Sequence, residues 1–257
     1  MSLKKNFIVH TPKEIEGIRI AAQKAAEVKI RLASMLRPGM STAEIDNLAA
    51  TLIATTGGTS AFLGYRGYPG VLCVSVNDEV VHGIGSPTKI LKMGDVVSLD
   101  IGVNYNGYIG DNATTVCIGG VHDKNVKRLF EGTEKALEAG IDAAIAGNYI
   151  KDISAAVEKI AKKYSISIVR EYVGHGCGVE LHEPPEIPNY CMRDKGPRLR
   201  PGMVLAIEPM LNLGKRNVIT QEDGWTVRTS DGSLSAHFEH MVLITDSKPE
   251  ILTWQKM

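Results

Sequence analysis

Three acidic residues of this 257-residue chain lie within or directly beside apolar, β-like segments: Asp100, Glu208 and Glu239. Asp100 lies inside Val96–Val103, and Glu208 directly follows Val204–Ile207. Core packing alone does not favour this pattern, because an unpaired carboxylate is costly in a low-dielectric interior. The acids are therefore candidates for binding a metal ion.

A turn at Asn106-Gly107 predicts a fourth acid at the same place, because Asn-Gly between two β-like segments is a strong hairpin signal. In the register of a two-residue turn, Asp100 pairs with Ala113, and Asp111 is its diagonal neighbour on the same face. Such neighbours lie about 7–8 Å apart at the backbone, near enough to share a metal. Carboxylates about 5 Å apart repel by roughly 3 kcal/mol at an effective dielectric of about 20, and divalent cations would cancel that repulsion.

One histidine adds a nitrogen to this oxygen-rich set. His175 lies in Gly174-His175-Gly176, where the glycines let the backbone approach a site closely. Four carboxylates with one imidazole suit Mn, Fe(II) or Co better than a closed structural zinc site. Two such ions could bridge a hydroxide and activate it near neutral pH, so the pattern predicts hydrolysis of an acyl or phosphoryl group.

An internal repeat relates two of the acids, Asp100 and Glu208. Asp100 and Glu208 are 208 − 100 = 108 residues apart, and Gly94 and Gly202 have the same separation, 202 − 94 = 108. The predicted helices repeat too: 12–36 and 42–55 are followed by 126–146 and 150–163. Helix, helix and then strands, given twice, predicts an α+β architecture of two pseudo-symmetric halves.

The predicted strands follow each helix pair. Segments 96–104 and 108–118 flank Asn106-Gly107, and Asp231-Gly232 separates a second predicted pair, 225–230 and 233–245.

Composition excludes several classes of protein. Twenty-nine basic and 29 acidic residues give no net charge, so neither nucleic-acid binding nor a membrane patch is indicated. The apolar run in Met1–Val9 is too short for a signal peptide or a membrane span. The dispersed cysteines argue against a zinc ribbon or a disulfide framework, and we expect a cytoplasmic protein. They are Cys73, Cys117, Cys177 and Cys191.

Motifs from the first third of the chain to its C-terminus resemble those of type I methionine aminopeptidases. The matching segments are 65–69 (Tyr-Arg-Gly-Tyr-Pro), 73–84, 99–102, Gly110-Asp111, 174–176, His182-Glu183, 207–210, 223–226 and 238–240. The resemblance implies the pita-bread fold, with a curved antiparallel β-sheet covered by helices. It also implies one metallopeptidase catalytic domain over residues 1–257, with halves at roughly 12–120 and 121–246.

The resemblance implies a role for each site residue. The five expected ligands of two divalent metal ions (Co, Mn or Fe(II)) are Asp100, Asp111, His175, Glu208 and Glu239, with Asp111 and Glu239 as bridges. Glu208 is also expected to carry a proton of the attacking water. His82 and His182 are expected to contact the scissile amide and the developing oxyanion. We expect surface or structural roles for the other histidines, which are His10, His122, His237 and His240.

The same resemblance implies an apolar pocket for a methionine side chain. Its expected walls are Tyr65, Tyr68, Cys73 and Trp225, with Phe62 and Leu181 nearby. Arg66 and Leu181 depart from the family pattern, which often has His and an aromatic residue there. The departures bear on the shape of the pocket rather than on the reaction.

The expected activity is removal of the initiator methionine from nascent polypeptides when the second residue is small. We expect a monomer, with the ribosome as a possible partner and no direct nucleic-acid or membrane contact. One alternative is a proline-directed aminopeptidase or prolidase of the same fold, although those enzymes generally carry a large extra N-terminal domain. A type II enzyme would need an insertion that the short interval from His182 to Glu208 lacks. The other alternative is a non-catalytic binding protein on this fold, although such proteins lose metal ligands.

Overall fold

Residues 6–254 contain four α-helices, three of which begin directly after a Thr, Ser or Asp that caps them. The computed structural model describes residues 6–254, so part of the segment assessed as a possible signal peptide, residues 1–5, lies outside it. In α1 and α2, Thr11 and Ser41 each accept a hydrogen bond from a backbone N–H three residues on, and a glutamate completes the capping box. The helices are α1 (Pro12–Met35), α2 (Thr42–Thr55), α3 (Lys124–Ala143) and α4 (Ile150–Lys163).

The predicted ranges 42–55 and 150–163 are confirmed, and 12–36 ends one residue earlier, at Met35. The third helix, α3, starts at Lys124 and ends at Ala143, so both of its ends come earlier than in the predicted range 126–146. Its N-cap is Asp123, whose carboxylate accepts from the N–H groups of Asn125 and Val126. This cap sets the helix start where apolar periodicity alone could not.

In the described part of the chain the strands form four sheets in which every pairing is antiparallel. One contains β1 (Thr59–Ser60), β2 (Cys73–Val76), β4 (Val96–Tyr105) and β5 (Tyr108–Cys117), and a second contains β6 (Ser167–Ile168), β10 (Met210–Asn212) and β13 (Ser235–His237). The third contains β3 (Glu79–Val81), β11 (Val218–Thr220) and β12 (Val227–Thr229). The fourth contains β7 (Gly174–Gly176), β8 (Glu183–Ile187), β9 (Val204–Ile207), β14 (His240–Leu243) and β15 (Glu250–Ile251). A short 3₁₀ turn spans Tyr65–Gly67.

The β4–β5 hairpin has the predicted register. Asp100 pairs with Ala113 and Gly102 with Asp111. Asn106 and Gly107 have φ values of 52° and 81°, as a type I′ turn requires. The predicted same-face placement of Asp100 and Asp111 is therefore confirmed.

The second predicted strand pair, around Asp231-Gly232, is wrong. β12 pairs with β11 and β3, whereas β13 pairs with β10, and segment 233–245 contains two strands, β13 and β14. The Asp231 carboxylate accepts hydrogen bonds from Lys215 N and Ser233 Oγ, both at 2.7 Å. These contacts hold the turn against the segment before β11 instead of closing a hairpin.

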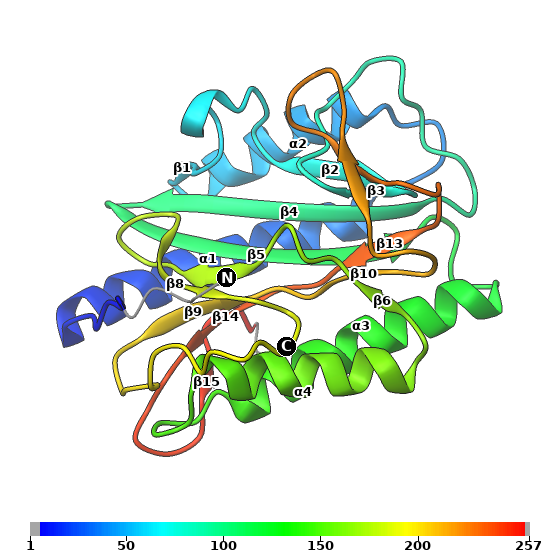
Figure 1. The fold of residues 1–257 in the computed structure, drawn as a ribbon. Coiled ribbons are helices and arrows are strands. Elements are labelled where there is room, and N and C mark those ends of the chain that lie inside the picture. The colour runs from blue at the N-terminus through cyan, green and yellow to red at the C-terminus, as the bar shows by residue number, and fades with distance from the viewer. Residues whose placement is uncertain (1–5, 255–257) are drawn as a thin grey trace.

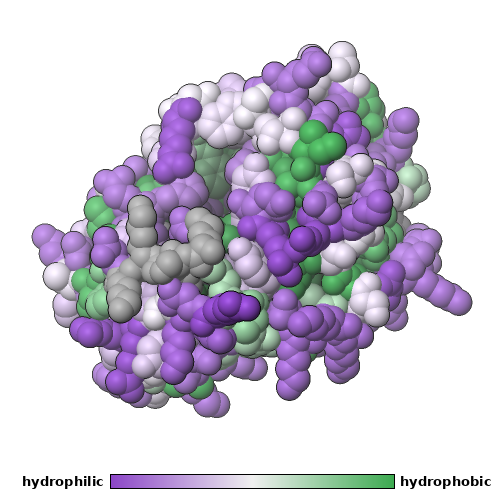
Figure 2. All heavy atoms as spheres, in the orientation of Figure 1, coloured by the Kyte–Doolittle hydropathy of each residue, from purple (hydrophilic) through white to green (hydrophobic). Residues whose placement is uncertain are grey.

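Helices cover the sheets on both halves of the molecule (Figure 1). α1 packs along β4 and β5, and one apolar core lies between α1, α2 and these strands, around Val28, Ile45 and Leu99. α3 and α4 pack on each other, with a second core around Ile153 and Ile207. Hydrophilic side chains dominate the face shown in Figure 2. Between residues 6 and 254, none of the helices has the length and apolar character that crossing a membrane requires.

Some backbone contacts of the first half occur again in the second half, 108 residues later. An isolated bridge joins Ser41 to Ile90, and another joins Tyr149 to Arg198, with both members displaced by 149 − 41 = 198 − 90 = 108. The N–H of Gly94 donates to the carbonyl of Ile118, and that of Gly202 to the carbonyl of Ile244. The acceptors are 244 − 118 = 126 residues apart, so the second half carries 126 − 108 = 18 additional residues between its paired strands.

Candidate active site

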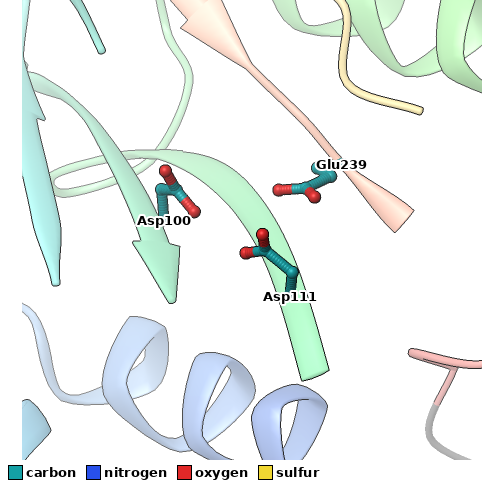
Figure 3. A group of neighbouring side chains, drawn as sticks. All are labelled: Asp100, Asp111 and Glu239. Carbon is teal, nitrogen blue, oxygen red and sulfur yellow. The ribbon is translucent and has the colours of Figure 1, made fainter. Parts of the chain in front are cut away.

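Three carboxylates from the two halves point toward one another (Figure 3). Asp100 comes from β4, Asp111 from β5, and Glu239 directly precedes β14, and one oxygen of each lies within 4.8 Å of the others. The Glu239 N–H donates to the Ala113 carbonyl at 3.1 Å, which ties the second half to β5. Asp111 and Glu239 are only 4% and 2% exposed.

The chemistry of this cluster fits divalent cations. One oxygen of each acid, Asp100 Oδ1, Asp111 Oδ1 and Glu239 Oε1, has no hydrogen-bond partner among the described residues. Burial, followed by repulsion from neighbouring acids, raises the pKa of Asp111 and Glu239 well above the usual range. Cations between the oxygens would satisfy them and cancel the repulsion.

His175 directs its ring nitrogen Nε2 toward Glu208. Its Nδ1 lies 2.9 Å from the Gly176 carbonyl, which can only accept, so this nitrogen carries the proton. The unprotonated Nε2 lies 3.3 Å from Glu208 Oε1 and 4.0 Å from Asp111 Oδ2. This is the tautomer that a metal-binding imidazole uses. Asn189 fixes the backbone beside it by donating to the Glu208 carbonyl at 3.0 Å.

A cavity of about 280 Å³ opens beside these acids. It is lined by every residue nominated from the sequence, which are Phe62, Tyr65, Tyr68, Cys73, His82, Asp100, Asp111, His175, Leu181, His182, Glu208, Trp225 and Glu239. They come from segments spread over most of the chain. The fold therefore brings the predicted ligands and the predicted pocket together.

Two histidines flank the cavity without belonging to the acid cluster. His82 follows β3 with a positive φ of 59°, and its ring meets Tyr172 and Trp225 edge-on at 5.3 and 6.2 Å. Burial lowers the pKa of His82 to about 4, so its imidazole is neutral at pH 7. His182 stacks on Tyr65, and partial burial followed by the nearby His175 lowers its pKa. Neutral imidazoles can donate or accept a proton near a reacting amide.

The apolar walls are fixed by packing and hydrogen bonds. The Tyr68 hydroxyl lies 2.8 Å from the Gly83 carbonyl and 3.0 Å from that of Leu72, so its ring face is left for the cavity. Trp225 packs edge-on against Tyr68 at 5.1 Å. A Cβ on Gly102 would lie 2.4 Å from the Phe62 ring, so this glycine allows Phe62 to approach β4.

Arg66 and Leu181, the two departures from the family pattern, also line the cavity. Leu181 is 4% exposed, and the Arg66 guanidinium lies 5.2 Å from the centre of the Tyr65 ring. A leucine and the long, charged side chain of an arginine thus form part of the cavity wall.

Sequence reasoning missed other lining residues: Val81, Glu171, Tyr172, Val173, Met210 and His237. Of the two roles expected for His237, surface or structural, burial excludes the surface, because it is 2% exposed, and its Nε2 lies 3.4 Å from Glu208 Oε2. A signal for it existed, since residues two apart on a strand share a face and His237 precedes Glu239 by two. His10 fits its expected role, with Nε2 buried 3.1 Å from Glu183 Oε2.

Comparison with known proteins covers nearly the whole chain. The model of metallopeptidase family M24 matches residues 16–246. Methionine aminopeptidase 1 of Bacillus subtilis is 47% identical over 247 residues, covering 96% of this chain and 99% of the relative. The chain belongs to the methionine aminopeptidases of metallopeptidase family M24. The Escherichia coli methionine aminopeptidase is 40% identical over 96% of this chain and 94% of its own length.

Solved structures agree with this family. The methionine aminopeptidase of Thermotoga maritima has a TM-score of 0.94 and 40% identity, covering 97% of this chain and all of that one. The prolidase of Pyrococcus furiosus shares the fold with a TM-score of 0.77 and 24% identity, but this chain covers only 66% of it. The predicted pita-bread fold is therefore confirmed for this methionine aminopeptidase family member.

Proposed function

We propose that this chain is a metal-dependent aminopeptidase that removes the N-terminal methionine from nascent polypeptides, favouring a small second residue. The observation that carries the proposal is the apolar cavity of about 280 Å³ that opens directly onto a cluster of buried, unpaired carboxylates. Its relatives named methionine aminopeptidase match nearly end to end.

Five residues would hold two divalent ions: Asp100, Asp111, His175, Glu208 and Glu239. Co, Mn or Fe(II) suits this oxygen-rich set with one imidazole. When bound, such ions supply positive charge that polarises the scissile carbonyl and lowers the pKa of a water. Asp111 and Glu239 are the proposed bridging ligands, since their oxygens lie within 4.8 Å of each other and of Asp100.

The remaining polar residues orient the substrate and handle protons. Glu208 holds a proton during attack, because burial raises the pKa of its carboxyl. His82 and His182 both border the cavity, although their segments are far apart in the sequence. We assign them to the scissile amide and to the oxyanion. The Tyr65 hydroxyl lies 2.8 Å from His182 Nδ1 and holds that ring in place.

The methionine side chain enters between the apolar walls. The residues proposed to form these walls all line the cavity: Phe62, Tyr65, Tyr68, Cys73, Leu181 and Trp225. An unbranched thioether is flexible and polarizable, so it fits an irregular aromatic pocket. Removing such a side chain from water stabilises binding by roughly 1.5–3 kcal/mol.

A peptide assay tests the proposal. The protein, supplied in turn with Mn, Fe(II) and Co, is incubated with Met-Ala-Ser and with a Xaa-Pro peptide. We expect release of methionine from Met-Ala-Ser alone. Preference for the Xaa-Pro peptide would indicate a proline-directed peptidase, and cleavage of neither would indicate a binding protein.

The cellular setting is part of the same proposal. Residues 1–257 would act as one monomeric catalytic domain in the cytoplasm, on chains emerging from the ribosome. The absence of net charge gives no support for direct contact with nucleic acid.

A further inference from the structure

The strand registers of the two halves identify an unexpected counterpart for Asp111. Val96 pairs with Cys117 in the first half, and Val204 pairs with Leu243 in the second. The first strand is thus displaced by 204 − 96 = 108 residues and the second by 243 − 117 = 126, as in the Gly94 and Gly202 hydrogen bonds. Adding 126 to 111 gives His237, so a histidine stands where the first half has a candidate metal ligand.

Register also places His237 on the face of the acids. Ile207 pairs with His240 and Met210 with His237, so Glu208 lies opposite Glu239. His237 is then the diagonal neighbour of Glu208, as Asp111 is of Asp100. Such neighbours are within reach of long side chains.

The His237 ring faces the acids of the site: Glu208 lies close to its Nε2, and the charge of Asp100 also acts on it. Its backbone is fastened on both sides by the Thr115 hydroxyl, which accepts from its N–H at 2.9 Å and donates to its carbonyl at 2.7 Å. Its Nε2 is buried, makes no hydrogen bond between residues 6 and 254, and lies 3.4 Å from Glu208 Oε2. The other oxygen of Glu208 faces His175 at 3.3 Å.

We propose that His237 is a positioning residue: its Nε2, 3.4 Å from Glu208 Oε2, would close to a hydrogen bond when the site is loaded and so keep Oε1 directed toward His175. The inference rests on the proposed function of this site as a metal centre. An imidazole can place its N–H on Nε2 in the neutral state, and a neighbour that fixes a ligating carboxylate commonly changes metal affinity 10–100-fold. His237 itself is not a ligand in this assignment.

Metal titration of matched variants tests this role without using turnover. His237→Gln keeps an N–H donor of similar reach, whereas His237→Met keeps the length and removes the donor. Isothermal titration of the metal-free proteins with Mn²⁺ should give His237→Gln an affinity within about threefold of wild type. His237→Met should bind about 10–100-fold more weakly. His122→Met, which removes an exposed histidine, is the control and should match wild type.

Visible absorption with Co²⁺ separates positioning from ligation. The ligand-field bands of His237→Gln should equal those of wild type, and a changed band pattern would overturn the assignment by making His237 a ligand. Equal Mn²⁺ affinity in His237→Met would overturn it too. If His237→Met does not fold, as judged by circular dichroism, His237→Asn replaces it. The asparagine amide is one bond shorter than the glutamine amide, which takes the donor away from Glu208. A wild type that binds metal but does not cleave Met-Ala-Ser would contradict the proposed function and leave this inference standing.

Discussion

The hydroxyl of Tyr65 and Nδ1 of His182 lie 2.8 Å apart, with the two rings stacked at 5.2 Å between centroids. The contact joins a residue of the 3₁₀ turn to one that is 117 positions later in the chain. It fixes the orientation of a ring that is otherwise exposed at the edge of the cavity. Preorganised donors of this kind act on developing charge without having to reorient.

Tyr65→Phe should therefore slow catalysis while leaving metal binding unchanged. The variant keeps the stacked ring but loses one hydrogen bond, which is worth about 0.5–1.5 kcal/mol. We expect kcat/KM on Met-Ala-Ser to fall by roughly 2–10-fold. Steady-state kinetics at saturating metal measures it. A rate equal to wild type would show that stacking alone orients His182.

His82→Asn should reduce turnover strongly at unchanged metal content. Asparagine tolerates the positive φ of 59° at this position, so the backbone is not strained. Asparagine cannot exchange a proton as an imidazole does, and loss of such a group commonly costs about 100–10,000-fold, so we expect kcat/KM to fall within that range. Elemental analysis gives the metal content, and His122→Asn is the matched control. Loss of metal from the His82 variant would mean that its role is misassigned.

Asp111→Asn should stabilise the metal-free protein and abolish most metal-induced stabilisation. Burial and then the Asp100 and Glu208 charges raise the pKa of this carboxyl, so removing it relieves repulsion. We expect a higher melting temperature in EDTA, and metal affinity weakened more than about 100-fold, beyond the usual effect of a residue outside the ligand set. Thermal melts with and without Mn²⁺ measure both, with Asp246→Asn as an exposed control. A full Mn²⁺ shift in Asp111→Asn would remove Asp111 from the ligand set.

Lys29→Met should stabilise the fold at neutral pH. This lysine of α1 is 8% exposed, and burial, opposed by the Glu239 charge, lowers its pKa to about 8. A depressed lysine pKa costs stability below the folded-state pKa, and the cost vanishes above the unfolded-state pKa of about 10.4. The variant should gain on the order of 3 kcal/mol at pH 7 and much less at pH 10.

Urea unfolding of the metal-free protein at both pH values measures this difference. Lys13→Met, at an exposed position near the start of the same helix, is the control and should show no such change. A gain for Lys29→Met that is equal at pH 7 and pH 10 would attribute it to packing rather than to charge.

Cysteine labelling should distinguish the cavity thiol from the surface thiol. Burial, followed by the nearby Asp100 charge, raises the pKa of Cys73 well above its usual value, and burial raises that of Cys177. Iodoacetamide at pH 8 should modify the exposed Cys191 first and reach these two only after urea is added. Peptide mass spectrometry reads the sites. Rapid modification of native Cys73 would mean that its thiol is ionised and reachable.

Local chemistry made much of the fold predictable. The Asn106-Gly107 turn fixes its own register, and Ser41 caps its own helix, so both features follow from a few adjacent residues. Because register fixes which side chains share a face, the proximity of Asp100 and Asp111 followed directly.

Pairings between distant segments were not predictable in this way. β12 pairs with β3, about 150 residues earlier, and nothing near Asp231-Gly232 encodes that partner. His237 was missed for a related reason, because its meaning depends on the register of β10 with β13 rather than on its own neighbours.

The 18 additional residues of the second half lie between β10 and β13, where the first half has only the two-residue turn at Asn106-Gly107. That excursion contains β11, β12 and Trp225, while the acids lie outside it, on or directly beside the repeated strands. Among the predicted pocket walls, Trp225 alone belongs to the excursion, and the other walls lie outside it together with the acids. A change in the excursion would therefore reach the pocket through Trp225, while the repeated framework keeps the four acids in place.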